Sequence, residues 1–146
     1  MTKILIPIER SIGERRVSAT PETVKKLKNL ECEVYIEKSA GELSGFNDFS
    51  YEESGGIIFT EEDLNTWNKV DIIFCVHCPD HQKLNKLKEG CLIIGLLNPF
   101  CNSDLAKFLS DKKLSAIALE LLPRISRAQS SDVLSSQANI AGYKSV

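Results

Sequence analysis

The stretch DIIFCVHCPDHQKLNKLKEGCLIIGLL, residues 71–97, decides the fold class. Its first part, residues 71–77, is a continuous apolar run, which is typical of a strand covered on both faces of a sheet. A polar helical segment follows, Gly90 ends it, and residues 91–97 form a second apolar run. Strands joined by helices of about 10 residues imply right-handed crossovers and a parallel sheet.

The same alternation runs through the rest of the chain. Strands are expected at residues 3–9, 33–39, 71–77, 91–97 and 115–122, with a brief apolar stretch at 56–59. Helices are expected after the cap Thr20, around 49–54, after the capping-box-like pair Thr60 and Asp63, and at 80–89 and 103–113. We therefore predict an α/β, three-layer, doubly wound domain with a mainly parallel, flavodoxin-like sheet of about five strands.

Composition excludes several classes of function. The formal net charge of −2 over 146 residues gives no support for a nucleic acid or an anionic membrane surface as a partner. The apolar runs are far too short to cross a bilayer, and the N-terminus lacks the apolar segment of a secretory signal. Cys75 and Cys78 have C-x-x-C spacing, but no second ligand pair matches it, so buried reduced thiols are favoured over a metal site.

A polar stretch, RISRAQSSDVLSSQANIAGY (124–143), follows the last predicted strand, at the edge of the sheet where ligands bind. Its candidate ligand-binding side chains are Arg124, Arg127, Gln129, Asp132 and Ser135. The arginines suit a phosphate, and the other three suit a carboxamide, which both donates and accepts hydrogen bonds. The alternative is a solvated helix that Ser130 or Ser131 caps.

The chain alone lacks the motifs of a complete enzyme. No G-x-G-x-x-G follows a predicted strand, because GELSG (41–45) has the wrong spacing. No phosphate-binding loop and no nucleophile–base pair is evident either.

Four segments resemble the alanine dehydrogenase/pyridine nucleotide transhydrogenase N-terminal domain. They are ERRVSATPETVKKL (14–27), SAGELSGFND (39–48), IIGLLNPF (93–100) and ELLPRISRAQSSDVLSSQANIAGYKSV (120–146). The last is similar to the alpha subunit, the NAD(H)-binding component, of proton-translocating NAD(P) transhydrogenases. The resemblance implies that residues 1–130 form the N-terminal lobe and that 131–146 begin a helix toward a Rossmann lobe, expected to be missing through truncation or gene splitting.

The resemblance also implies a site and an activity. Arg124 and the backbone of Ile125, Ser126 and Arg127 would flank the nicotinamide and phosphates of NAD(H), Asp132 and Ser135 would fix the carboxamide, and Gln129 would reach toward NADP(H) on a partner domain. Hydride transfer between the two nucleotides, coupled to proton translocation, needs no catalytic acid or base, so the protein's task is positioning. The implied partners are NADP(H)-binding and membrane components and a second copy of the chain, in a cytoplasmic location peripheral to the inner membrane. The fragment alone is expected to be inactive.

Two other hypotheses for the function stay open. An alanine dehydrogenase-like amino-acid oxidoreductase is disfavoured, since Cys75 stands where that family places a substrate-binding lysine and Asn98-Pro99 stands where it places a histidine. Arg16, which those enzymes use for the substrate, is then expected to pair with an acidic neighbour. The third reading is a non-catalytic remnant or interaction module.

Two further expectations concern stability. Glu31 stands where the family usually has a glycine, which costs about 1 kcal/mol if the backbone φ is positive. The last helix carries apolar side chains that are expected to be exposed and to promote self-association: Val133, Leu134, Ile140 and Tyr143.

Overall fold

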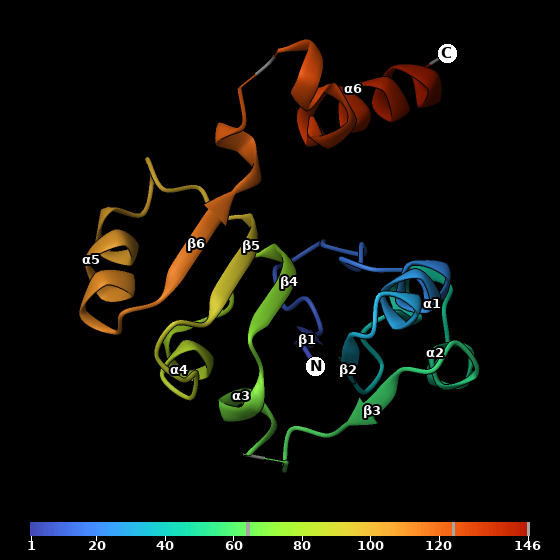
Figure 1. Ribbon diagram of the computed structural model, residues 1–146. Coiled ribbons are helices and arrows are strands. Elements are labelled where there is room, and N and C mark those ends of the chain that lie inside the picture. Colours follow the sequence, from blue (N-terminus) through green and yellow to red (C-terminus); the bar gives the residue numbers. More distant parts are fainter. Residues whose placement is uncertain (64, 124, 146) are drawn as a thin grey trace.

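A single parallel sheet organises the chain, with strand order β3-β2-β1-β4-β5-β6 (Figure 1). The strands are β1 (Lys3–Ile6), β2 (Glu33–Glu37), β3 (Ile57–Phe59), β4 (Ile72–His77), β5 (Leu92–Leu96) and β6 (Ser115–Ala118). The computed structural model describes residues 1–63, 65–123 and 125–145, and describes Ser103, Arg127 and Ser130 without their side chains.

The strand order confirms the α/β prediction and adds one strand to it. Without β3 the order β2-β1-β4-β5-β6 is the flavodoxin-like order, and β3 extends it at one edge to the order 3-2-1-4-5-6. In both descriptions the strand order reverses between β1 and β4, and a crevice forms there beyond the carboxyl ends of the strands.

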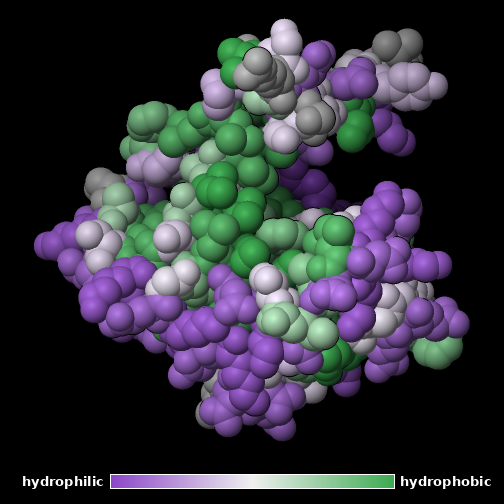
Figure 2. Space-filling view, viewed as in Figure 1, coloured by the Kyte–Doolittle hydropathy of each residue, from purple (hydrophilic) through white to green (hydrophobic). Residues whose placement is uncertain are grey.

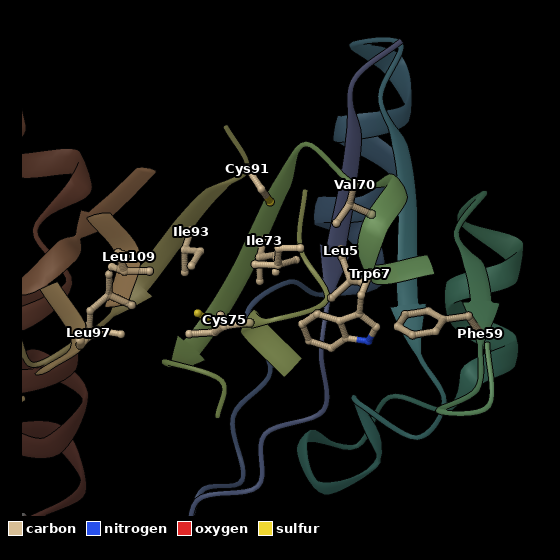
Figure 3. Packing of buried hydrophobic residues seen from close by; sticks show 13 residues of the cluster. Leu5, Phe59, Trp67, Val70, Ile73, Cys75, Cys91, Ile93, Leu97 and Leu109 are labelled. Carbon is tan, nitrogen blue, oxygen red and sulfur yellow. The ribbon is translucent and has the colours of Figure 1, made fainter. Parts of the chain in front are cut away.

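Helices cover the two faces of the sheet unequally. The helices are α1 (Pro21–Asn29), α2 (Asp48–Glu53), α3 (Thr66–Lys69), α4 (His81–Leu84), α5 (Ser103–Asp111) and α6 (Val133–Lys144), and the 3₁₀ turns are η1 (Glu42–Ser44), η2 (Leu119–Leu121) and η3 (Ser126–Ser131). One core cluster joins α3, α4 and α5 to β1, β4 and β5, with Trp67, Ile73 and Ile93 among its members (Figure 3). The other joins α1 and α2 to β1 and β2.

The α1/α2 face of β5 and β6 has no described helix packed on it. Leu92 and Ile94 on β5 are only half-buried, and Ile117, which pairs with Ile94 from β6, is 40% exposed. Figure 2 shows apolar residues gathered over β5, β6 and η2. No helix in the described ranges 1–63, 65–123 and 125–145 has the length and apolar character to cross a membrane.

Local sequence signals explain where α1 begins and ends. The Thr20 hydroxyl accepts a hydrogen bond from the Thr23 amide at 3.3 Å, and Pro21 occupies the first turn, as predicted. Glu31 follows the C-terminal end with φ of 59°. The backbone φ is thus positive at this position, which is the condition under which a side chain is expected to cost about 1 kcal/mol.

Four predicted boundaries are wrong. The strand predicted at 3–9 ends at Ile6, because Pro7 has no amide hydrogen to donate to a neighbouring strand. The helix expected after Thr60 begins at Thr66, because Thr60 and Asp63 close a turn in which the Asp63 amide donates to the Thr60 carbonyl at 3.0 Å. Of the helix predicted at 80–89, only His81–Leu84 is helical, as α4. The chain then turns so that Leu84 and Leu87, three residues apart, are both buried in the core. The strand predicted at 115–122 ends at Ala118, where η2 begins.

Candidate functional site

A pocket of about 300 Å³ lies in the connection between β6 and α6, beyond the carboxyl end of the sheet. Its lining residues are Ile125, Ser126, Gln129, Asp132 and Ser135. These are five of the seven residues that the sequence predicted for the site. Arg124 lies outside the described residues, and of Arg127 only the backbone is described, so the predicted phosphate contacts are not placed.

Asp132 organises this pocket. Its Oδ1 accepts hydrogen bonds from the amides of Leu134 at 3.1 Å and Ser135 at 3.0 Å, and its Oδ2 accepts the Ser135 hydroxyl at 2.6 Å. Asp132 is therefore the N-cap of α6, and the expectation that Ser130 or Ser131 caps this helix is wrong. The reason is that the backbone through Ser131 forms the 3₁₀ turn η3, so the first helical amides face Asp132 instead.

The Asp132–Ser135 pair offers the hydrogen-bonding groups that a carboxamide requires. The carboxylate oxygen is an acceptor for an amide N–H, and the rotatable Ser135 hydroxyl can donate or accept. Because Asp132 is already held by two backbone amides, its carboxylate is fixed before any ligand arrives. Capping and ligand binding are therefore compatible roles for one side chain.

A second cavity, of about 350 Å³, has residues from five segments of the chain in its wall, including α6. They are Arg16, Val17 and Ser18 before α1, Cys75, Val76, Leu96 and Leu119 at the carboxyl ends of the strands, and Val133 and Gln137 on α6. Cys75 is 4% exposed, burial raises the pKa of its thiol, and the thiol donates to the Ile94 carbonyl at 3.6 Å. At this point of the wall the chain presents a neutral thiol rather than a cation.

Arg16 is engaged by the protein itself. Its Nε lies 2.8 Å from Glu14 Oε1 and its Nη2 lies 2.6 Å from Glu14 Oε2, so the expected pairing with an acidic neighbour is confirmed. The Arg16 guanidinium is the main cause that lowers the pKa of Glu14 to about 2. The same carboxylate is 2.8 Å from His77 Nε2, and Arg16 Nη1 donates to Gln137 Oε1 at 3.0 Å.

A buried charge network that the sequence did not predict lies near the point where the strand order reverses. Glu37, the last residue of β2, is 3% exposed and lies 2.9 and 3.1 Å from Lys83 Nζ through its two oxygens. It also accepts the Ile8 amide at 3.0 Å and Arg10 at 3.1 Å. The Lys83 ammonium lies 5.2 Å from the centre of the Trp67 ring, a cation–π contact.

A second acid that is partly buried, Glu9, lies three residues after the end of β1. Its two oxygens accept the amides of Val76 at 2.6 Å and His77 at 3.1 Å, and this joins β1 to β4 beyond their last paired residues. Burial raises the pKa of its carboxyl above the ordinary value. An acid as the last residue of the strand predicted at 3–9 was the available sequence signal for Glu9, whereas nothing local identified Glu37 as buried.

Three of the five cysteines have the character of buried thiols, whereas Cys101 is exposed. Cys75 and Cys91 are buried and Cys78 is half-buried, and burial raises the pKa of Cys78 and Cys91 to about 11. Thiols with raised pKa values are poor nucleophiles and poor metal ligands at neutral pH. Within the described parts of the chain, no three side chains of His, Cys, Asp or Glu gather as a metal-ligand set.

Comparison with known proteins gives consistent similarities. The family model described as "Alanine dehydrogenase/PNT, N-terminal domain" matches residues 5–141. The NAD(P) transhydrogenase subunit alpha of Haemophilus influenzae is 39% identical over 141 residues, which cover 97% of this chain and 27% of that protein.

Solved structures agree with the family match. The transhydrogenase of Sinorhizobium meliloti superposes with a TM-score of 0.89 at 38% identity, covering 97% of this chain and 40% of that one. An L-alanine dehydrogenase superposes with a TM-score of 0.74 at 26% identity, covering 82% and 32%. The chain thus spans between about a quarter and two-fifths of the length of these relatives.

Proposed function

The chain belongs to the alanine dehydrogenase/PNT N-terminal domain family, and we propose that it is the lobe that positions the nicotinamide of NAD(H) in a NAD(P) transhydrogenase. The observation that carries this proposal is the pocket in which Asp132 and Ser135 form a prearranged pair at the start of α6. The greater similarity to transhydrogenase subunits than to alanine dehydrogenases supports it.

In this proposal the residues of the chain bind and orient the nucleotide. Asp132 accepts a carboxamide N–H, and the Ser135 hydroxyl rotates from Asp132 to donate to the carboxamide oxygen, while Gln129 faces the nucleotide on a partner domain. Arg124 and the backbone from Ile125 to Arg127 flank the nicotinamide and its phosphates. When bound, NAD(H) supplies the hydride that is exchanged with NADP(H) on the partner. Since a hydride passes directly between two nicotinamide rings, no side chain has to transfer a proton.

Amino-acid oxidation is disfavoured by the same cavity wall. A substrate carboxylate would need a cation, but Cys75 is a buried thiol and Arg16 is already paired with Glu14. Asn98, after β5, has no imidazole with which to assist proton transfer. The chain therefore offers few of the groups that an alanine dehydrogenase reaction requires.

The wider assembly belongs to the proposal as well. We propose that the chain acts with an NADP(H)-binding domain and a membrane component, as a homodimer at the membrane surface, with hydride exchange coupled to proton translocation; it spans only 27% and 40% of two of its relatives. A single lobe encloses a nucleotide from one side only, so we expect measurable binding only when a second lobe is supplied.

Two neighbouring serines allow a matched test. The Ser135 hydroxyl lines the pocket, whereas the Ser136 hydroxyl donates to the backbone carbonyl of Asp132 at 3.1 Å and does not line it. In a mixture of this chain with the second lobe of a homologous alpha subunit, Ser135→Ala should weaken NADH binding about tenfold, the loss of one hydrogen bond of about 1.4 kcal/mol. Ser136→Ala should leave the affinity unchanged. Equal effects of the two substitutions on the NADH dissociation constant would overturn the proposal.

A further inference from the structure

Helix α6 has little apolar contact with the rest of the chain. Val133 is half-buried, and the other residues from Leu134 to Lys144 are exposed. Figure 1 shows α6 standing away from the sheet beyond η2. The orientation of such a helix depends on few contacts, so each polar contact has a large influence.

One side-chain hydrogen bond joins α6 to the segment before α1. Arg16 Nη1 donates to Gln137 Oε1 at 3.0 Å, across 121 positions of the chain. The described hydrogen bonds of Asp132, Ser135, Ser136 and Ser145 lie instead within the helix or at its ends. The Arg16–Gln137 contact is therefore well placed to orient the helix.

Arg16 is itself held rigidly. Both Glu14 oxygens bind its guanidinium, and Glu14 Oε1 also accepts the backbone amides of Arg15 at 3.0 Å and Arg16 at 2.9 Å. The Glu14 side chain is only 8% exposed, and His77 at the end of β4 contacts its second oxygen. With one edge of the guanidinium fixed by Glu14, Nη1 is left to contact α6.

We propose that Glu14 and Arg16 are positioning residues that hold α6 through Gln137 and thereby set the place of Asp132 and Ser135. Ser135 precedes Gln137 by two residues on the same helix, and Asp132 caps that helix. A rotation of α6 about its cap would move the Ser135 hydroxyl relative to the sheet. This inference rests on the proposed function for its effect on the nicotinamide, but the contact itself can be tested in the chain alone.

Substitutions that change the charge at position 137 test this contact, because opposite charges should change the rate of amide hydrogen exchange in opposite directions. Gln137→Glu places a carboxylate beside Arg16 and should slow amide hydrogen exchange in residues 134–144 about threefold, whereas Gln137→Lys should accelerate it by a similar factor. The matched controls are Asn139→Glu and Asn139→Lys, because Asn139 is another exposed amide side chain of α6 and these variants measure the effect of charge on the helix dipole alone. If position 137 responds no more than position 139, the proposal is wrong.

A second measurement tests the consequence for binding. With a second lobe and an NADP(H)-binding domain present, Gln137→Lys should raise the KM for NADH about threefold and leave kcat nearly unchanged, since the contact affects placement of the nucleotide and not the hydride step. If exchange changes but KM does not, the contact is merely structural and the positioning claim is overturned. If the unsubstituted chain supports no NADH binding in this mixture, the proposed function fails, while the exchange result still decides whether Arg16 holds α6.

Discussion

The buried pair of Lys83 and Glu37 gives a prediction of stability that can be worked from its geometry. Substituting Lys83→Met keeps most of the length of the side chain but removes the ammonium that lies 2.9 and 3.1 Å from the Glu37 oxygens. Both side chains are nearly enclosed, at 9% and 4% exposure. Removing one member of a buried ion pair costs about 3–5 kcal/mol, because the remaining charge stays desolvated.

The expected cost lies near the lower limit of that range. Glu37 keeps its hydrogen bonds from the Ile8 amide and from Arg10, so its charge is not left without partners. We therefore expect Lys83→Met to lower the free energy of unfolding by about 3 kcal/mol, a large share of the ~5–15 kcal/mol typical of a domain. The double variant with Glu37→Gln removes both charges and should recover more than half of this loss.

Urea unfolding, followed by circular dichroism and by the fluorescence of Trp67, measures these differences. Lys88→Met is the control, since Lys88 and its partner Asp71 are 40% and 39% exposed and should contribute less than about 1 kcal/mol. A loss for Lys83→Met within about 1 kcal/mol of the control loss would refute the reasoning, because it would mean that the pair is not desolvated.

Three other positions give predictions of stability. In the folded protein Arg16 lowers the pKa of the Glu14 carboxyl from 4.5 to about 2, so this carboxylate adds to the free energy of unfolding fully above about pH 4.5 and less as the pH falls toward 2. Glu14→Gln should remove this pH-dependent contribution. If urea unfolding of the variant and of the unsubstituted protein changed in parallel across this pH range, the prediction would be wrong. Glu31→Gly should raise the free energy of unfolding by about 0.5–1 kcal/mol, since φ is 59° there, and a lower thermal midpoint would count against it. Gly95→Ala should lower the free energy of unfolding by about 1–3 kcal/mol, because the added Cβ would lie 2.5 Å from the Cys75 carbonyl oxygen. An unchanged urea midpoint would show that β4 and β5 can move apart at little cost.

The parts of the fold that the sequence predicted are those with long hydrophobic patterns. The central strands β4 and β5 are continuous apolar runs, so both their existence and their parallel pairing were predictable. Strand β3 has only three residues, too few to show a period, and it forms because β2 presents an edge with which it pairs. Whether such a short strand forms therefore depends on its pairing partner, which is distant in the sequence.

In the candidate site, too, local features were predictable from the sequence and contacts between distant residues were not. Gln129, Asp132 and Ser135 were predicted from their polar side chains after the last strand, and Ile125 and Ser126 from the family resemblance, although Asp132 rather than a serine caps α6. Both residue types are good caps, so the choice depends on where η3 ends, which the sequence does not specify to within two residues. The pairing of Glu37 with Lys83 joins residues 46 positions apart, and only the folded sheet brings them together.

Isotope transfer tests the central claim most directly. Deuterium at C4 of NADH is followed in a mixture of this chain, the second lobe of a homologous alpha subunit and an NADP(H)-binding domain supplied with NADP⁺. We expect deuterium in NADPH when this chain is present, and a much lower rate with Ser135→Ala than with Ser136→Ala. Absence of label from NADPH, together with an NADH affinity of the second lobe that this chain does not change, would contradict the account.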